Sequence, residues 1–324
     1  RGLGDVYKRQ IEERLHIPVV GVIPMEQIDL DDEDSLSDRL VRTEVQEGLD
    51  VAVIHLPHIS NFTDFNALEH YDGVSLRYVN RAAQLGRPDL ILLPGTKNTM
   101  ADLKWLRESG LEAMIQRLVE EQKIPVIGIC GGYQMLGERL SDPEGVEGEP
   151  GSTMRGMGLL AAETIFAAEK TRTQTEGTVL AAAGYYGKVT GQSVTGYEIH
   201  MGRTVLSKGT VPLVYMEEEG EQRQDGAQSD HVYGCYMHGI FDMSETVKTF
   251  LAAVLRKKGI DPSKITVRDR NAYKEEQYDR LASIVRENLN MEAVYKIIEK
   301  GNEASCSLSV SYTHLRAHET RRHL

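Results

Sequence analysis

The chain has 324 residues, with 37 Lys and Arg against 49 Asp and Glu and a formal net charge of −12, an acidic balance that disfavours a nucleic-acid or anionic-membrane surface. Its length predicts one large or two ordinary domains, and its 40% of hydrophobic residues exclude wholesale disorder. No apolar stretch approaches the roughly 20 residues that span a bilayer, and the three cysteines lack disulfide-framework or zinc-finger spacing, so we expect a cytoplasmic protein without a metal site.

The two ends of the chain differ from its body. Residues 1–10 and residues 311–324 lack apolar periodicity, and each carries three basic residues against one acidic residue, a net charge of +2. Both resemble translated sequencing-adapter read-through, although genuine disordered tails have a similar composition. We predict that residues 1–10 and 306–324 are non-native and that they carry no functional residue.

Between these ends, short apolar runs alternate with amphipathic segments. The first run, Ile17–Ile23, reads as a buried strand that Pro24 ends. The further strands are predicted at Leu49–Leu56, Val74–Val79, Pro88–Leu93, Ile124–Cys130 and Val232–Met237. The helices are predicted at Thr99–Ser109, Leu111–Gln122 and Thr246–Lys257, with a turn or short helix at Asn61–Leu68. This alternation predicts an α/β fold with a mostly parallel sheet flanked by helices on both faces.

The remaining segments are less regular. Residues 141–156 are rich in Gly, Pro and acidic residues and read as a loop, and several short strands with glycine turns are expected between residues 157 and 217. Beyond Pro262, apolar residues recur at helical spacing, and Asn290 suits the N-cap of a helix at Met291–Lys300 that Gly301 would stop. The sequence therefore predicts a C-terminal helical extension.

The sharpest chemical feature is IPVIGICGGYQMLG at Ile124–Gly137. A buried strand runs into Gly128-Ile129-Cys130-Gly131-Gly132 before a helix begins, which is the cysteine form of a nucleophile elbow. The N-terminus of the following helix favours a thiolate, and the N–H of Gly131 is placed to bind an oxyanion. An inert buried cysteine at a strand end is the structural alternative.

A cysteine nucleophile needs a base, and His238 follows directly after the predicted strand Val232–Met237. Ligands and catalytic groups gather beyond the carboxyl ends of parallel strands, which favours His238 over His231 at the other end of that strand. The turn after Leu93 in LPGTKNT offers a second oxyanion donor, the N–H of Gly95. This turn lacks the spacing of a phosphate-binding P-loop.

Five sequence blocks together resemble the cobyric acid synthase family of glutamine-dependent amidotransferases, from about Ile17 to about Ile298. The blocks are ISNFTDF at Ile59–Phe65, LPGTKNT at Leu93–Thr99, GICGGYQMLG at Gly128–Gly137, GYEIHMGRT at Gly196–Thr204 and YMHGIFD at Tyr236–Asp242. The resemblance implies a class I, triad-type glutamine amidotransferase on a flavodoxin-like sheet, with Cys130 and His238 as its catalytic pair.

The resemblance also implies a domain order. Residues 11–45 would be the remnant of an ATP-dependent synthetase domain and its linker, residues 46–258 the amidotransferase domain, and residues 259–305 the C-terminal helices. We therefore expect a fragment truncated at its N-terminus. The glutaminase part would need no cofactor, whereas the intact enzyme would use ATP and Mg²⁺ to activate carboxylates of a corrinoid. Its partners would be glutamine, the corrinoid and its own synthetase domain. The implied reaction amidates side chains b, d, e and g of adenosylcobyrinic acid a,c-diamide to give cobyric acid.

One position departs from the pattern. Many class I amidotransferases place a Glu two residues after the histidine, where this chain has Ile240. Glu198, Asp242 and a group from the missing domain are the candidates for the carboxylate that orients His238, and His200 either contacts substrate or packs. The alternative functions are a related amidotransferase, acting on the a and c carboxylates or in the cell wall, a γ-glutamyl hydrolase of the same fold, and a binding module with a structural Cys130.

Overall fold

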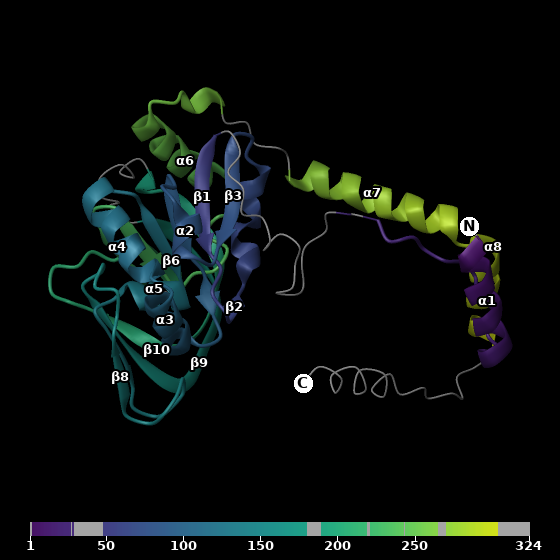
Figure 1. Ribbon diagram of the computed structural model, residues 1–324, viewed down its shortest axis with the longest axis horizontal. Coiled ribbons are helices and arrows are strands. Elements are labelled where there is room, and N and C mark those ends of the chain that lie inside the picture. Colours follow the sequence, from purple (N-terminus) through teal and green to yellow (C-terminus); the bar gives the residue numbers. More distant parts are fainter. Residues whose placement is uncertain are drawn as a thin grey trace. The chain divides into compact units, whose positions relative to one another are not determined.

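The structure is a computed structural model that describes residues 2–26, 28, 48–179, 189–218, 221–242, 244–264 and 270–303. The chain divides into two compact units, residues 31–270 and a smaller unit made of residues 1–30 and 271–324 (Figure 1). The predicted boundary at residues 45–46 and the whole predicted tail 306–324 lie outside the described residues. The domain boundaries and the non-native segments therefore stay predictions.

The larger unit is built on a six-stranded sheet. Its strands lie in the order β13 (Ala227–Ser229), β14 (Val232–Cys235), β6 (Val126–Ile129), β4 (Leu90–Leu93), β1 (Leu49–Ile54) and β3 (Val74–Val79). All neighbours are parallel except β13 and β14. Every residue of β1, β4, β6 and β14 is buried, because helices cover both faces of such a sheet. This confirms the predicted α/β class.

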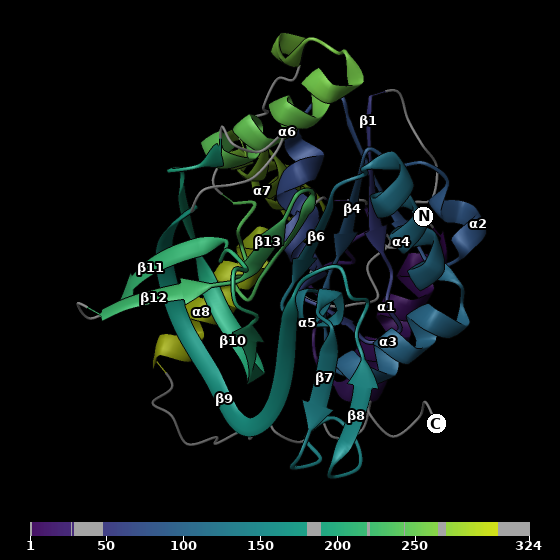
Figure 2. The ribbon, with the colours of Figure 1, turned by 90° about the vertical axis from the view of Figure 1, so that its left-hand side faces the viewer.

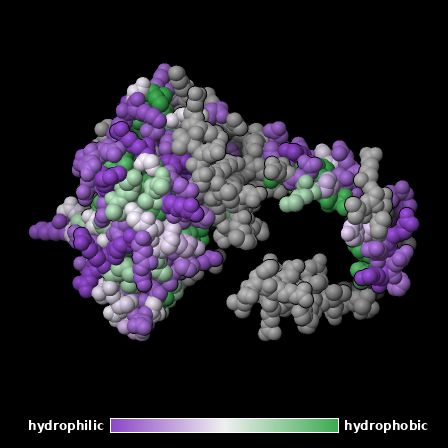
Figure 3. All heavy atoms as spheres, in the orientation of Figure 1, coloured by the Kyte–Doolittle hydropathy of each residue, from purple (hydrophilic) through white to green (hydrophobic). Residues whose placement is uncertain are grey.

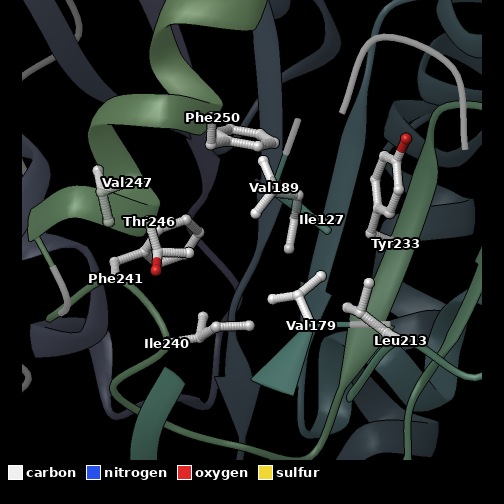
Figure 4. Close-up of a pocket in the computed structure, with 10 residues that line it drawn as sticks. All are labelled: Ile127, Val179, Val189, Leu213, Tyr233, Ile240, Phe241, Thr246, Val247 and Phe250. Carbon is white, nitrogen blue, oxygen red and sulfur yellow. The ribbon is translucent and has the colours of Figure 1, made fainter. Parts of the chain in front are cut away.

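Helices lie on both sides of this sheet. Figure 2 shows α3 (Thr99–Glu108) and α4 (Leu111–Gln122) on one side and α6 (Ser244–Lys258) on the other. Short α2 (Ala82–Leu85) precedes β4 in the chain. Phe250 and Val247 of α6 line an apolar pocket of about 60 Å³, together with strand residues such as Ile127 (Figure 4). Val247, Phe250 and Leu251 of α6 belong to the buried hydrophobic core, which holds α6 on its face of the sheet.

A second sheet extends from the first. It contains β12 (Glu221–Asp225), β11 (Val214–Glu218), β9 (Ala162–Val179), β7 (Arg139–Asp142) and β8 (Ser152–Arg155), and β10 (Ser193–Leu206) pairs with β9. The prediction of a loop at residues 141–156 was therefore wrong at both of its ends, where β7 and β8 pair. The expected short strands are instead mainly one long antiparallel ribbon, β9–β10.

The glycines in this ribbon are strand residues rather than turns. Gly196 lies inside β10, where a Cβ would stand 1.9 Å from the carbonyl oxygen of His238. Gly202, with φ +83°, occupies the irregularity between Met201 and Arg203 where the register with β9 shifts. Both glycines thus allow a close approach or a bulge, which the sequence pattern alone does not distinguish from a turn.

The smaller unit consists of α1 (Gly2–Leu15), α7 (Arg270–Asn288) and α8 (Met291–Glu303). The predicted strand Ile17–Ile23 is wrong, since only Gly21 forms a bridge, to Leu289, and Ile17 is 60% exposed. Asn290 caps α8 as predicted, because its Oδ1 accepts the N–H of Ala293 at 3.1 Å. Gly301 does not stop this helix, which continues to Glu303.

None of the helices within the described ranges is long and apolar enough to cross a membrane. On the face of the larger unit drawn in Figure 3, hydrophilic residues predominate and apolar ones are scattered. Such scattered apolar residues are ordinary on a protein exterior.

Candidate active site

The predicted chemical residues meet at one edge of the parallel sheet. Cys130 follows β6, Gly95 follows β4, and His238 follows β14. Because the carboxyl ends of parallel strands share an edge, these residues converge although they are distant in sequence. Cys130 and His238 border an open cleft of about 320 Å³, and Gly95 adjoins its lining residue Thr96. The cleft is lined by Ser60, Asn61, Thr96, Lys97, Thr99, Cys130, Gln134, Glu147, Ile199, His200, Met201 and His238.

Cys130 has a strained backbone, with φ +52° and ψ −109°, just before α5 (Gly131–Leu136). A non-glycine residue in this region is uncommon and costs about 1–3 kcal/mol. The strain is held by backbone packing, since a Cβ on Gly132 would lie 2.2 Å from the oxygen of Leu93. The Cys130 N–H donates to the oxygen of Cys235 at 2.9 Å, and Sγ lies 3.7 Å from the oxygen of Ile199. The predicted nucleophile elbow is present in this geometry.

His238 is 1% exposed and is fixed from several directions. Its Nδ1 lies 2.7 Å from Oδ2 of Asp64, whose Oδ1 accepts the N–H of Gly239 at 3.1 Å. Its backbone exchanges two hydrogen bonds with Tyr197, and the two rings stack at 5.1 Å. Since Asp64 occupies Nδ1, Nε2 remains for the thiol of Cys130.

The charge state of His238 follows from these neighbours. Burial lowers its pKa, but hydrogen bonds and charges from Asp64 and Cys130 outweigh burial and raise the pKa to about 10. His238 therefore holds a proton at neutral pH beside Asp64. A thiol, an imidazole and a carboxylate placed in this order are the groups that a nucleophile, a base and an orienting carboxylate require.

Asp64 was not among the predicted site residues. It lies in a 3-10 helix, Phe62–His70, that follows β2 (Ile59–Ser60), the strand that pairs with β5 (Gly95–Thr96). The predicted candidates were Glu198, Asp242 and a group from the missing domain, whereas Asp64 lies 174 positions before His238. The one signal was that Asp64 belongs to the block ISNFTDF.

The predicted orienting carboxylates are placed differently. Glu198 is fully buried, and its Oε2 accepts Nη2 of Arg223 at 2.6 Å. The N–H of Asp242 donates to the oxygen of Gly239 at 2.8 Å. The carboxylate on Nδ1 of His238 is that of Asp64, so the expectation that Glu198 or Asp242 orients His238 is corrected.

The two predicted oxyanion glycines lie beside the catalytic pair. A Cβ on Gly131 would lie 3.2 Å from the backbone nitrogen of Thr96, and one on Gly95 would lie 3.2 Å from Cε1 of His238. The Gly95–Thr96 segment is held in place by β2, through the pairing of Ser60 with Gly95. The turn after β4 and the start of α5 therefore pack together at the cleft, and the donor roles of Gly95 and Gly131 remain predictions.

His200 both packs and borders the cleft. Its ring stacks on Tyr236 at 3.7 Å, and Nδ1 lies 3.0 Å from the oxygen of Gly202. Burial lowers the pKa of His200 to about 4, against the opposing hydrogen bond to Gly202. His200 is therefore neutral at pH 7, and Nδ1–H donates to Gly202.

Glu147 enters the cleft on a loop that the sequence did not mark as functional. The buried carboxylate of Asp142 accepts the N–H groups of Val146, Glu147 and Gly148 at 2.8–3.0 Å. Oε2 of Glu147 accepts the N–H of Met100 at 3.2 Å, and burial raises the pKa of Glu147. Among the residues that line the cleft, Lys97 carries the one ammonium group and Glu147 the one carboxylate. This pair of charges suits a zwitterionic amino acid.

The described part of the chain holds no group of three or more His, Cys, Asp or Glu residues arranged for a metal ion. The chemistry of this cleft is built from a thiol, an imidazole, carboxylates and backbone amides. Those groups suffice for acyl transfer through a thioester.

Comparison with known proteins gives one family match and many similar relatives. Residues 50–246 match the CobB/CobQ-like glutamine amidotransferase domain. The chain is 50% identical over 293 residues to the cobyric acid synthase of Ruminiclostridium cellulolyticum, covering 89% of this chain and 56% of that protein. It is 44% identical over 296 residues to that of Lachnoclostridium phytofermentans, covering 88% of this chain and 57% of the relative.

A solved structure titled "Structure of PurLQS from Thermotoga maritima" is 18% identical, with a TM-score of 0.48 over 65% of this chain and 99% of that chain. The chain spans little more than half the length of the curated relatives it matches. The family match includes Cys130, Asp64 and His238 within its residues 50–246. This chain belongs to the family of CobB/CobQ-like glutamine amidotransferases.

Proposed function

We propose that the cleft hydrolyses L-glutamine to glutamate and ammonia, with Cys130 as nucleophile, His238 as acid and base, and Asp64 as the group that orients His238. The observation that carries this proposal is the 2.7 Å contact between His238 Nδ1 and Asp64 Oδ2, next to a cysteine held at φ +52°. Family membership supports glutamine as the substrate.

The chemical steps follow from the positions of these groups. The Cys130 thiol gives its proton to Nε2 of His238, and Sγ then attacks the side-chain amide carbon of glutamine. N–H groups of Gly131 and Gly95 bind the oxyanion, and His238 returns the proton to the leaving nitrogen, which departs as ammonia. His238 next removes a proton from water, which attacks the γ-glutamyl thioester. Glutamate leaves, and the thiol is restored.

The similarity to longer relatives supports a larger reaction in which the ammonia from this cleft is used. Curated relatives named cobyric acid synthase are 40–50% identical to the chain and are longer than it. We propose that the ammonia amidates side chains b, d, e and g of adenosylcobyrinic acid a,c-diamide in the cytoplasm. The longer relatives have room for a synthetase part, which would use ATP and Mg²⁺ to activate these carboxylates. The glutaminase cleft itself would need neither ATP nor Mg²⁺.

The first test is covalent labelling with an electrophilic glutamine analogue, followed by intact mass measurement and peptide mapping. We expect one label per chain, on Cys130, blocked by excess glutamine and abolished in His238→Ala. Cys235 is fully buried and burial raises the pKa of its thiol, so Cys235→Ser is the control variant that should label normally. Label spread over several cysteines, or none in a folded sample, would contradict the proposal.

A further inference from the structure

The segment that carries His238 into the cleft has an unusual support. β14 pairs with β6 as far as Cys235, so Tyr236 and Met237 lie beyond the ladder of the sheet. Their N–H groups are bound by one side chain, because Oδ2 of Asp225 accepts the N–H of Tyr236 at 2.8 Å and that of Met237 at 3.3 Å. Asp225 is 5% exposed. The two residues before His238 are thus fixed by a buried carboxylate.

The backbone around Asp225 places this carboxylate against β14. The next residue, Gly226, has φ +76°, and a Cβ there would lie 2.2 Å from the oxygen of Gly234. A glycine is required for the chain to turn at such a close approach. The oxygen of Cys235 in turn accepts the N–H of Cys130. The end of β14 therefore touches the nucleophile residue on one side and Asp225 on the other.

We propose that Asp225 is a positioning residue for the Cys130–His238 pair, because its carboxylate fixes the two-residue connection that sets where His238 enters the cleft. The proposal rests on the catalytic pair of the proposed function. It adds a group that does not touch the cleft, since Asp225 is absent from the cleft lining.

The surroundings of Asp225 disfavour a negative charge at this position. Burial, followed by the charge of Glu198 on β10, raises the pKa of Asp225 to about 7, while backbone N–H groups oppose this rise. The other titratable groups that face it are Cys235 of β14, Tyr133 of α5 and Tyr236. Arg223, on the same strand as Asp225, is bonded to Glu198. Asp225 is thus a buried carboxylate near the carboxylate of Glu198, and its hydrogen-bond partners are the N–H groups of the two residues before His238.

The test compares Asp225→Ala and Asp225→Asn with a buried carboxylate far from the cleft. Asp50 is 7% exposed, bonds Arg77 at 2.7 Å and lies near the start of β1, away from the carboxyl edge of the sheet. Two quantities are measured in each variant: the pH profile of Cys130 alkylation by iodoacetamide, read by peptide mapping, and kcat and KM for glutamine.

We expect Asp225→Ala to move the pH profile of alkylation towards that of His238→Ala. It should lower kcat about 10-fold or more and change KM less than about 2-fold, because small displacements of reacting groups slow the chemical step strongly. Asp225→Asn keeps an amide oxygen as acceptor and should lie between Asp225→Ala and the wild type. Asp50→Asn should lower the melting temperature and leave both quantities unchanged.

A folded Asp225→Ala with the wild-type profile and kcat would overturn the proposal. If that variant does not fold, Asp225→Asn decides in the same way. Failure of the proposed function looks different. In that case glutamine is not hydrolysed by the wild type, yet the Cys130 profile still answers whether Asp225 couples to His238.

Discussion

Asp64 reaches His238 from a helix 174 positions earlier in the chain, and it holds both the imidazole and the following N–H group. Asp64→Asn keeps the shape of this contact but removes the negative charge. We expect kcat for glutamine to fall about 100-fold or more, because no carboxylate then fixes the tautomer of the imidazole or stabilises its cationic form. The measurement is steady-state release of ammonia.

The same variant should change the titration of His238. Since Asp64 is the first of the groups that raise the pKa of His238 to about 10, Asp64→Asn should lower that pKa. NMR titration of the His238 ring resonances measures this directly. An unchanged pKa would show that Asp64 does not govern the proton on His238.

Glu147 is the carboxylate in the cleft wall and would bind the α-ammonium group of glutamine. We expect Glu147→Gln to raise KM about 10-fold or more, since a charged hydrogen bond contributes about 1.5–3 kcal/mol, while iodoacetamide still alkylates Cys130 at the wild-type rate. Glu149→Gln is the matched control, because Glu149 is exposed on the same loop. Equal KM values for the two variants would remove Glu147 from substrate recognition.

His200 predicts how stability responds to acid. Its folded-state pKa is lowered to about 4 from 6.5, so the unfolded chain binds the proton more readily. The contribution of His200 to stability is thus present above pH 6.5 and is lost as the pH falls towards 4. We expect the melting temperature of the wild type to drop more between pH 7 and pH 5 than that of His200→Gln. An identical drop would mean that His200 does not titrate in this range.

At the scale of elements, the elbow depends on close contact between β4, β6 and α5. A Cβ on Gly132 would overlap the oxygen of Leu93 at 2.2 Å, whereas nothing lies within 4 Å of a Cβ on Gly148. We expect Gly132→Ala to lower the free energy of unfolding by about 2 kcal/mol or more and to slow labelling of Cys130, because backbone must shift. Gly148→Ala should change neither quantity, and urea unfolding of both variants measures the difference.

The parallel strands could be predicted because each is short and rich in apolar residues, and Leu90–Leu93 is apolar throughout. The same rule failed for Ile17–Ile23, where a β-branched run has no sheet beside it in the described residues and forms a single bridge. The β9–β10 ribbon was broken up in the prediction because its glycines look like turns in a single sequence. An apolar run alone therefore predicts neither burial nor a partner strand, since Ile17 is 60% exposed and both properties depend on what packs against the run.

Some residues of the site could be predicted from the sequence and others could not. Cys130 and His238 stand beside strand ends, so local pattern and sheet geometry led to them. Asp64 meets His238 only after the chain from β1 to β14 has assembled, and no spacing rule reports a contact at that separation. Glu147 likewise enters the cleft because Asp142 gathers three N–H groups of its loop, a local arrangement that composition alone described as an acidic loop.

At the scale of the whole molecule, the chain covers little more than half the length of its curated relatives. The proposed division of labour makes a simple prediction. The chain alone should release ammonia from glutamine at a rate that ATP and Mg²⁺ do not alter, and it should not hydrolyse ATP. Coupled assays of ammonia and of ADP measure both. ATP-dependent ammonia release by this chain would contradict the assignment of ATP use to the part of the longer relatives that this chain does not match.

The order of the catalytic groups along the chain has a consequence for synthesis in the cell. Translation produces Asp64 first and Cys130 next, and His238 follows only near the end of the larger unit. In nascent chains the thiol is therefore present before His238 can take its proton, and β14 must dock on β6 before the three groups meet. A ribosome-bound intermediate would carry a cysteine that is not activated by His238, and it would not hydrolyse glutamine until β14 has paired with β6.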